Sequence, residues 1–382
     1  MPRLLIFDTH PIQYRSPVFG ALAQREPSLK VLFFNSAFNG NQWWFQEVGK
    51  IPRQTWELPL QEGFDNDILQ TEGLGFVRTY RKLKEALLRE KPDRVAVYGY
   101  YLPEHWMLRW LCARLRIPLI FVGETFQGGD WSFRRMVKTP LRRFFFRGVS
   151  RFITIGEKTQ AYYRGLGIAE NRLIPAKYCI DHAFFNQSEE TARKTREQWR
   201  LKWGIPDDAF VLLFVGRLFE RKRPQDALCL QHALVREKNA YLVMVGNGPQ
   251  EDFLKEQSYG IPRVIWTGFQ NQAATRDAYY GADLLFVPSE FETWGLVVNE
   301  AAACGLPALI TDTCGVAGDL VQHRETGFVY PCGHVGRALE YVRKVIAEPG
   351  LAKGLGAAAR DKVRAQYNVG QFADAFVKAV TV

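Results

Sequence analysis

The stretch FVLLFVGRLFERKRPQDAL, residues 210–228, joins a strongly apolar run to a glycine, two spaced cations and a helical pattern that begins with proline. The apolar run predicts a buried strand, and Gly216 after it predicts a tight turn. Arg217 and Lys222 follow that glycine. A guanidinium and an ammonium at the end of a strand can bind a diphosphate, the first as a fork and the second as a point charge. An ordinary charged surface loop is the alternative that this stretch leaves open.

Short apolar runs of this kind alternate with longer helical patterns along the whole chain. They include LLIFD, KVLFF, DRVAVYGY, PLIFVGE and RFITIG in the first half, and AYLVMVG, RVIWTG, DLLFVP and PALITD in the second. Such alternation predicts α/β structure with parallel sheets, and 382 residues suit two Rossmann-like, doubly wound domains. The polar stretch 186–204 indicates the boundary, which gives domains over 1–186 and 187–365.

The composition is that of a globular protein, with 47% hydrophobic and 24% charged residues. The start MPRLLIFDTH lacks the features of a secretory signal, and no apolar run is long enough to span a membrane. The six cysteines show no metal-ligand spacing, so we expect reduced thiols and a cytoplasmic location. The net charge of +10 lies mostly in residues 1–190, which leaves nucleic acid, an anionic membrane or a phosphorylated substrate open.

Three further strand ends in the second half carry ligand-type turns. AYLVMVG runs into Asn247, Gly248 and a proline, RVIWTG ends at Gly268 before Phe269, and DLLFVP leads into an acidic loop. The carboxyl ends of parallel strands share one edge of a sheet, where ligands bind in this architecture. The order of a cationic pair, a glycine-rich turn, a glycine turn and an acidic loop is more specific than any one of them.

The acidic loop belongs to PSEFETWGLVVNEAAACG, residues 288–305. It places Glu292 and Glu300 with seven residues between them, across the point where an apolar helical pattern begins. Taken alone, this is equally typical of a helix N-terminus with an acidic residue near its positive dipole end.

Together these motifs resemble a known family over most of residues 205–340. VGRLFERKRP, VGNGP, TGF, PSEFETWGLVVNEAAACGLPALITDTCG and ETGFVYP look, in order and spacing, like the donor domain of the large retaining glycosyltransferase family four. That resemblance implies a GT-B fold, two Rossmann-like domains facing across a cleft, and a nucleotide-sugar donor, with uridine favoured over guanosine. It also implies that residues 366–382 form a helix that crosses back to the first domain, with an apolar stripe of Val369, Phe372, Phe376 and Val380.

The resemblance assigns roles to individual residues. Glu292 would contact the transferred sugar, Glu300 would accept hydrogen bonds from the ribose, and Arg217 with Lys222 would stabilise the leaving diphosphate in place of a metal. Neither a metal ion nor a cofactor is therefore expected. The remaining donor contacts fall on the turns and on the start of the helix, at Gly216, Asn247, Gly248, Gly268, Phe269, Thr293, Trp294, Gly295 and Leu296.

The first half resembles the family more loosely, as its acceptor domains do. THPIQYRSPVF resembles the start of a subset with an HPIQY-like motif, which would place His10, Gln13 and Tyr14 at the interdomain cleft. The alternative is a plain helix start with Thr9 as its N-cap.

Glu124 follows the strand PLIFVG, where many family members have a functional histidine. It would be a catalytic polar contact to the donor sugar, or would simply begin a loop. His105 is expected to be a packed helical histidine. The chain also departs from the family at Cys179-Ile180-Asp181, where an Asn-Gly pair is common, so the backbone contacts there stay open.

Residues 134–151 hold seven Lys and Arg residues without an acidic one, interleaved with Phe144, Phe145 and Phe146. Such a segment can lie on an anionic bilayer or hold a phosphorylated acceptor, or it can be solvated charge around a buried aromatic stripe. No nucleic-acid motif accompanies it.

The expected activity is a metal-independent, retaining hexosyltransferase that acts on a hydroxyl of a glycan, glycolipid or small molecule, in cell-envelope glycan synthesis at the inner face of the membrane. Departure of the diphosphate and attack by the hydroxyl would occur on one face of the sugar. A nucleotide-sugar epimerase or hydrolase of the same fold is the first alternative. A non-catalytic partner subunit is the second, and the intact Arg217, Lys222, Glu292 and Glu300 count against it.

Overall fold

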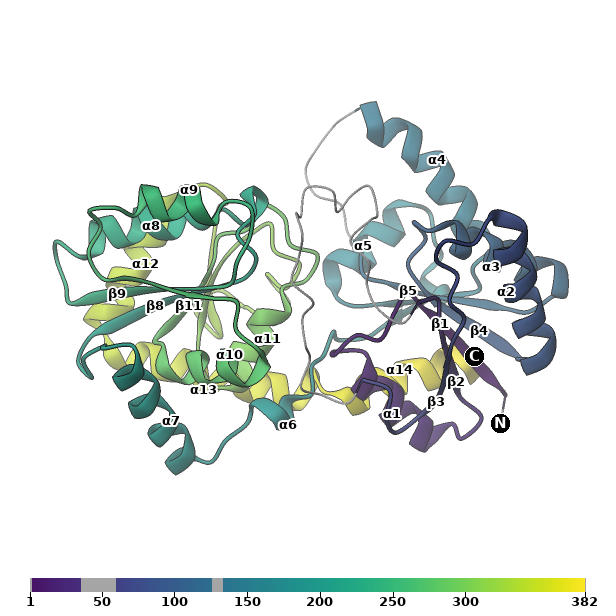
Figure 1. The fold of residues 1–382 in the computed structure, drawn as a ribbon, viewed down its shortest axis with the longest axis horizontal. Coiled ribbons are helices and arrows are strands. Elements are labelled where there is room, and N and C mark those ends of the chain that lie inside the picture. Colours follow the sequence, from purple (N-terminus) through teal and green to yellow (C-terminus); the bar gives the residue numbers. More distant parts are fainter. Residues whose placement is uncertain (1, 36–59, 126–132, 382) are drawn as a thin grey trace. The chain divides into compact units, whose positions relative to one another are not determined.

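The structure is a computed structural model that describes residues 2–35, 60–125 and 133–381, except for the side chains of 133–138. The chain divides into two compact units (Figure 1). The described residues up to Cys179, together with those from Asn368 onward, form the first unit, and Ile180–Tyr367 belong to the second. The division comes before residue 186, and the polar stretch 186–204, most of which is helix α7 (Glu189–Lys202), belongs to the second unit.

The first unit is built on a parallel sheet. Its described strands run in the order β3-β2-β1-β4-β5-β6-β7. Their bounds are β1 Leu4–Asp8, β2 Lys30–Phe33, β3 Asp65–Ile68, β4 Arg94–Tyr98, β5 Leu119–Gly123, β6 Arg151–Thr154 and β7 Leu173–Pro175. The central strands are buried along their length, as the near-continuous apolar runs in the sequence predict for a parallel sheet covered on both faces.

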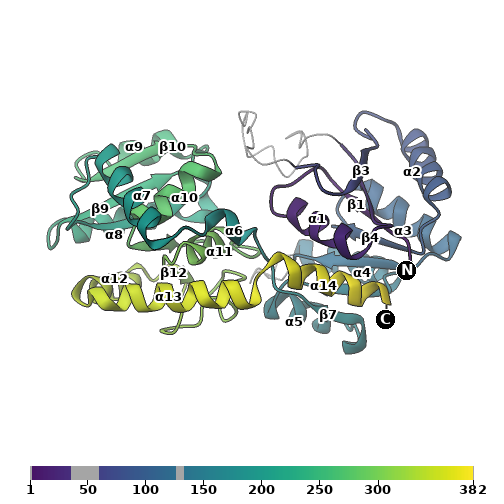
Figure 2. The same ribbon diagram turned by 90° about the horizontal axis from the view of Figure 1, so that it is seen from below.

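The helices of the first unit connect these strands, and the last helix of the chain joins them. Helix α14 (Val369–Thr381) lies beside α1 (Ser16–Arg25) and reaches β6 and β7 (Figure 2). Phe372, Phe376 and Val380 are buried there. The other helices are α2 Phe76–Glu90, α3 Pro103–Leu115, α4 Phe133–Arg147 and α5 Glu157–Gly165, with a short 3₁₀ turn η2 at Glu170–Arg172.

The second unit has a parallel sheet in the order β10-β9-β8-β11-β12-β13. The strands are β8 Phe210–Val215, β9 Ala240–Val245, β10 Val264–Gly268, β11 Leu284–Val287, β12 Ala308–Thr311 and β13 Gly327–Tyr330. The helices are α6 His182–Phe185, α7, α8 Pro224–Leu234, α9 Glu251–Gln257, α10 Gln272–Gly281, α11 Leu296–Ala303, α12 Val335–Ala347 and α13 Pro349–Gln366, with the 3₁₀ turn η3 at Glu220–Lys222.

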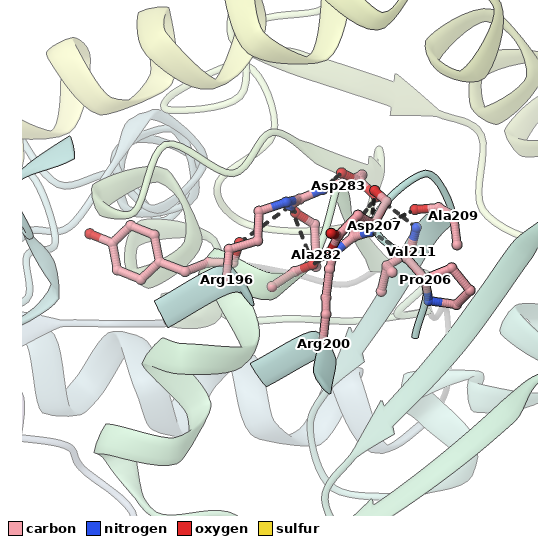
Figure 3. A network of polar contacts seen from close by, with 10 residues as sticks. Arg196, Arg200, Pro206, Asp207, Ala209, Val211, Ala282 and Asp283 are labelled. Carbon is pink, nitrogen blue, oxygen red and sulfur yellow. Dashed lines mark hydrogen bonds and ion pairs between the residues drawn. The ribbon is translucent and has the colours of Figure 1, made fainter. Parts of the chain in front are cut away.

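A buried arginine network fastens α7 to the amino ends of this sheet (Figure 3). Arg200 is 1% exposed and donates to the Asp283 carboxylate over 2.8 Å and to the backbone carbonyls of Gly281, Pro206, Asp207 and Ala209. Arg196 donates to the other Asp283 oxygen over 2.6 Å, and the amide of Val211 reaches Asp283 over 2.7 Å. Because a buried charge is tolerated only when it is fully paired, this network fixes where β8 and β11 begin.

Each sheet reverses its direction of growth at one pair of neighbouring strands. In the first unit the pair is β1 and β4, and in the second it is β8 and β11. Adjacent loops leave such a pair on opposite sides of the sheet, which opens a crevice at the carboxyl ends of the strands. The two switch points are therefore the places in each unit where a ligand site is expected.

Candidate active site

The switch point of the second unit brings together a cation and a carboxylate from distant parts of the chain. Lys222 lies in η3 after β8, and Glu292 lies in the loop after β11. The Lys222 ammonium donates to the Glu292 carboxylate. Parallel pairing of Leu212 with Leu284 places the two strand ends side by side, so the loops that follow them meet.

Arg217 lies on the same loop as Lys222 and is half-buried. No described residue accepts a hydrogen bond from its guanidinium, while burial and the charge of Arg221 lower its pKa. Burial also lowers the pKa of Lys222 to about 8, and the nearby Arg221 and Arg217 act in the same direction. The carboxylate of Glu292 favours the charged ammonium. This loop thus concentrates positive charge with an uncommitted guanidinium, the arrangement that favours an anionic ligand.

Glu300 lies one to two turns into α11, on the helix that begins after the acidic loop. The hydroxyl of the buried Tyr279 donates to its carboxylate over 2.7 Å. Burial raises the pKa of Glu300 to about 7, and the Tyr279 hydrogen bond only partly opposes that shift. A carboxylate fixed in this way can accept hydrogen bonds from a vicinal diol such as a ribose, provided that it is ionised.

The glycine-rich turn after β9 is required by the packing of the chain itself. Gly246 has φ +131, and a Cβ there would lie 2.0 Å from the carbonyl oxygen of Gly216. A Cβ at Gly248 would lie 2.7 Å from the backbone of Leu218, to which Asn247 also bonds through its carbonyl. The glycines of this turn therefore allow it to pack against the loop that carries Arg217. The sequence predicted instead that they would let a ligand approach the backbone.

The next strand end supports the same edge of the sheet. The carbonyl of Gly268 accepts a 2.8 Å hydrogen bond from the amide of Gly246, and φ +68 at Gly268 turns the chain out of β10. Phe269, which follows it, is 41% exposed. An exposed aromatic ring beside these turns is available for stacking on a planar ligand.

The loop before α11 packs against the backbone around Cys314 and Gly315, with which Glu292 forms an isolated β-bridge. Gly295 is the N-cap residue, with φ +103, and Leu296 is the first helical residue. The backbone N–H groups of a first helical turn lack intrahelical acceptors and point out of the helix end. The backbones of Thr293 and Gly315 lie so close together that a Cβ at Gly315 would be 2.1 Å from the carbonyl oxygen of Thr293. Trp294 is buried and donates from Nε1 to Asn299 over 2.8 Å, so its side chain anchors the helix start.

The predicted first-half residues lie in the loop between β1 and α1. The alternative with Thr9 as a helix N-cap is wrong, because α1 begins at Ser16 with Arg15 as its N-cap residue. Nδ1 of His10 lies 2.9 Å from the Thr9 hydroxyl, and burial with the nearby Arg15 charge lowers the pKa of His10 to about 4. Gln13 has a buried Oε1 without a hydrogen-bond partner in the described chain.

Tyr14 packs edge-on against Tyr178, with their ring centroids 5.7 Å apart. Burial, which outweighs the nearby Arg15 charge, raises the pKa of Tyr14 to about 12, so its hydroxyl stays protonated in any neutral buffer. Tyr14 therefore offers this loop a neutral hydroxyl rather than a charge.

Glu124 accepts hydrogen bonds from two other side chains, so it does more than begin a loop. The Arg15 guanidinium donates to its Oε1 over 2.8 Å, and the Tyr178 hydroxyl donates to the same oxygen over 2.8 Å. Arg15 also donates to Asp8 over 2.5 Å at the end of β1. We call Asp8, Arg15, Glu124 and Tyr178 the first-unit charge cluster. Sequence reasoning missed three of its four members, although Asp8 is visible as an acidic residue that ends a buried strand.

The prediction that His105 is a packed helical residue is confirmed. It is fully buried, with Nε2 2.8 Å from the carbonyl of Tyr98 and Nδ1 accepting from the amide of Leu102 over 3.0 Å. Burial lowers its pKa to about 3, so the ring is neutral. Both ring nitrogens serve the fold, and neither is available for chemistry.

In the basic segment 134–151, the described side chains place exposed charge beside buried aromatic rings, and contact with a membrane or an acceptor stays a prediction. Phe145 and Phe146 are fully buried in the core, while Phe144 is 54% exposed and stacks on Trp106. Arg143 and Arg147 are exposed. Arg142 donates to the Tyr162 hydroxyl over 3.0 Å, so part of the positive charge is engaged within the unit. The side chains of residues 134–138 lie outside the described part of the chain.

Two further observations concern the described residues alone. They contain no group of three or more His, Cys, Asp and Glu side chains arranged to hold a metal ion. None of their helices is both long and apolar enough to cross a membrane. The donor residues predicted from the sequence lie in the second unit, while His10, Gln13, Tyr14 and Glu124 lie in the first.

Two units in one chain, each with a parallel, doubly wound sheet, are the architecture of the GT-B class of glycosyltransferases. Sequence profiles of known families agree with this class. The family described as "Glycosyl transferases group 1" matches residues 195–362, and the "Glycosyl transferase 4-like domain" matches residues 14–177. The chain belongs to the family-four-like GT-B glycosyltransferases.

Individual relatives fit this assignment. The chain is 31% identical over 137 residues to an uncharacterised glycosyltransferase of Methanocaldococcus jannaschii, a match that spans 35% of each chain. It is 25% identical over 223 residues to N-acetyl-alpha-D-glucosaminyl L-malate synthase of Bacillus anthracis, over 53% of this chain and 57% of that one. The matches therefore span only about a third to just over half of these relatives.

Solved structures show the same fold over the full length. The Anabaena protein HepE in complex with UDP superimposes with a TM-score of 0.78 at 16% identity, over 99% of both chains. WaaG, a glycosyltransferase involved in lipopolysaccharide biosynthesis, superimposes with a TM-score of 0.69 at 17% identity, over 99% of both chains. At these identities the likeness concerns the fold alone.

Proposed function

We propose that this chain transfers a hexose from a uridine-diphosphate sugar to an acceptor hydroxyl, with retention of the anomeric configuration. The observation that carries the proposal is the second-unit switch point, where Lys222 pairs with Glu292 while the Arg217 guanidinium has no described acceptor. A free guanidinium beside a paired ammonium is suited to a diphosphate that gains charge as it leaves.

The residues divide the work by charge and position. Arg217, Lys222 and the backbone N–H groups at the start of α11 stabilise the departing diphosphate. Glu292 holds hydroxyls of the transferred sugar, and Glu300 accepts hydrogen bonds from the ribose. The bond from the anomeric carbon to the phosphate oxygen breaks, the acceptor oxygen bonds to the same face of that carbon, and its proton passes to the leaving phosphate oxygen. Fixed cations perform this step in our proposal, so neither a metal nor a cofactor takes part.

Uridine as the base is supported by the nucleotides bound in structural neighbours. The Anabaena structures hold UDP and UDP-glucose. Phe269, exposed beside the glycine turns, is the aromatic ring in this unit on which the base would stack. The structural neighbour WaaG is involved in lipopolysaccharide biosynthesis, which supports a role in cell-envelope glycan synthesis. The exposed Arg143 and Arg147, beside the exposed Phe144, support attachment to an anionic inner membrane surface.

A donor panel followed by analysis of the product tests the proposal. Titration calorimetry compares UDP, GDP, UDP-glucose, UDP-N-acetylglucosamine and GDP-mannose, and we expect the uridine compounds to bind most tightly. Proton NMR then follows the anomeric signal of the product formed with a mixture of sugar and polyol acceptors, and we expect the configuration of the donor. An inverted product would contradict retention, and preferential binding of GDP would contradict the choice of base.

The same assay separates the alternatives. An epimerase converts the donor without an acceptor, a hydrolase releases free sugar at a rate that acceptors do not change, and a non-catalytic subunit does neither. A rate of UDP release that rises with acceptor concentration is the outcome that a transferase requires.

A further inference from the structure

The two carboxylate oxygens of Glu124 have different surroundings. Its Oε1 accepts hydrogen bonds from both Arg15 and Tyr178, each over 2.8 Å. Its Oε2 accepts none from the described chain, and 25% of the side chain remains exposed. One oxygen is thus committed to the protein, while the other retains its capacity to accept hydrogen bonds.

The arginine that holds Glu124 is itself held on three sides. Arg15 is buried, and its guanidinium donates to Asp8, donates to Glu124, and lies 4.2 Å from the centroid of the Tyr98 ring. Asp8 is fully buried at the end of β1, and the amide of Thr9 also donates to it over 2.7 Å. Buried charges that are removed from water keep a single arrangement when their partners are fixed in this way.

The cluster lies at the switch point of the first unit. Asp8 ends β1, one of the two strands of the switch-point pair, and Tyr98 ends the other, β4. Glu124 follows β5, the next strand in the sheet. The charge cluster is therefore built into the carboxyl edge of the sheet, where a ligand of this unit would bind, and is not a stabilising pair on a remote face.

We propose that Arg15 is a positioning residue for the transfer reaction: it fixes Glu124 so that Oε2 accepts a hydrogen bond from a substrate hydroxyl. This inference rests on the proposed transferase function and adds to it a residue that neither the motifs nor the family resemblance assigns. Arg15 does not contact the substrate. Its planar guanidinium bridges two carboxylates at once, and the single ammonium of a lysine cannot reproduce that geometry.

A role confined to stability is the competing explanation, and it predicts a different pattern. A stabilising pair lost on substitution lowers the Tm and leaves turnover of the remaining folded protein unchanged. A positioning residue lowers kcat in protein that is still folded and still binds UDP, because a misplaced polar contact near the reacting atoms costs about a hundredfold in rate.

The test uses the full chain and the UDP-sugar that supports the fastest wild-type turnover in the donor panel. Release of UDP, the Kd for UDP and the Tm are measured for Arg15→Lys, Arg15→Ala, Glu124→Gln and the double variant Arg15→Ala with Glu124→Gln. Arg25→Ala is the matched control, since Arg25 is exposed in the same unit and pairs with the exposed Asp374 over 3.0 Å. Tyr178→Phe, which removes one hydroxyl, replaces the larger changes if they prevent folding.

We expect Arg15→Lys and Arg15→Ala to lower kcat about a hundredfold with an unchanged Kd for UDP, and the double variant to be no slower than Glu124→Gln. Guanidinium chloride, at a concentration that leaves the wild-type Tm unchanged, should partly restore Arg15→Ala but not Glu124→Gln, whereas sodium chloride of equal ionic strength should restore neither. Tyr178→Phe should lower kcat several-fold.

Wild-type kcat in folded Arg15→Ala or Tyr178→Phe would overturn the positioning role. A double variant whose fold-loss in kcat equals the product of the two single losses would overturn it as well, because Arg15 would then act independently of Glu124. If the wild-type chain itself transfers no sugar, the proposed function fails, which is a separate result from a failure of these variants.

Discussion

The ammonium of Lys222 donates to the carboxylate of Glu292 across 70 positions of the chain. The two residues follow β8 and β11, which are neighbours in the sheet although β9 and β10 intervene in the sequence. In our proposal this pair places the carboxylate that contacts the sugar hydroxyls beside the cation that contacts the diphosphate. It also prevents either charge from being left alone in a partly buried loop.

The cations of this loop should be essential for turnover. Replacing Arg217 or Lys222 with alanine is expected to lower kcat at least about a hundredfold, since one lost donor to a developing anion costs roughly 3 kcal/mol. The measurement is UDP release by each purified variant, with circular dichroism to confirm the fold. Lys255→Ala, at an exposed position of α9 where Lys255 pairs with Glu251, is the control and should be unaffected. Near-normal rates in both loop variants would remove the diphosphate role.

Nucleotide binding should strengthen as the pH rises through about 7. Burial raises the pKa of Glu300 to about 7 from 4.5, and the ribose hydroxyls need its ionised form. Calorimetric titration of UDP across this range should show a rising affinity that Glu300→Gln abolishes, while the exposed Glu256→Gln leaves it intact. A pH-independent Kd in the wild type would contradict the ribose contact.

The same shift has the opposite sign for folding. Between pH 4.5 and about 7 the folded chain holds the Glu300 proton while the unfolded chain has released it. The contribution of Glu300 to the free energy of unfolding therefore falls as the pH rises through this window. Glu300→Gln should remove that part of the pH dependence from denaturant titrations.

Transfer should persist in excess chelator. In our proposal Arg217, Lys222 and the start of α11 stabilise the leaving diphosphate, so removal of divalent ions leaves the chemistry intact. UDP release is measured after dialysis against EDTA and again after Mg²⁺ or Mn²⁺ is added back. Activity that disappears with EDTA and returns with either ion would refute the proposal.

Arg200 should contribute several kcal/mol to the free energy of unfolding. Arg200→Met leaves the backbone carbonyls that accept from Arg200 without their donor, and each buried polar group left unpaired is expected to lower the free energy of unfolding by about 1–3 kcal/mol, although Arg196 still pairs with Asp283. Adding Asp283→Leu in the same chain should lower the free energy of unfolding further, because Arg196 and the amide of Val211 then lose their acceptor. Denaturant titration measures both, and Arg193→Ala, in an exposed pair on the same helix, should cost less than about 1 kcal/mol. Equal stability of Arg200→Met and the wild type would show that the network is dispensable.

The exposed cations of α4 should bind anionic membranes. Each Lys or Arg near such a surface contributes about 1 kcal/mol, so Arg143→Glu with Arg147→Glu should reduce sedimentation with anionic vesicles at low salt. Arg142 is left unchanged because it bonds to Tyr162 within the unit. Arg193→Glu with Lys194→Glu, exposed on α7, gives the same change in net charge and should sediment like the wild type. If the wild-type chain stays in the supernatant, the segment is a solvated face or an acceptor site.

The sequence by itself determined the strands, the turns after them and the class of protein. Buried parallel strands are predicted from local apolar runs, and Gly216, Gly248 and Gly268 mark the turns at the ends of such runs. These features depend on neighbouring residues alone. The spacing between Glu292 and Glu300 is likewise a local property, since both lie in one loop and the helix that follows it.

Only the tertiary structure decided which charges meet. The Lys222–Glu292 pair depends on the order of strands in the sheet, and the Tyr279 hydrogen bond that accompanies the raised pKa of Glu300 depends on how α10 packs on α11. The cluster that holds Glu124 joins residues 109 positions apart. Periodicity describes the face on which a side chain lies, but not the partner that another strand end or helix brings to it. Because burial and pairing set the charge state, the chemistry of these residues follows from packing and not from their identity alone.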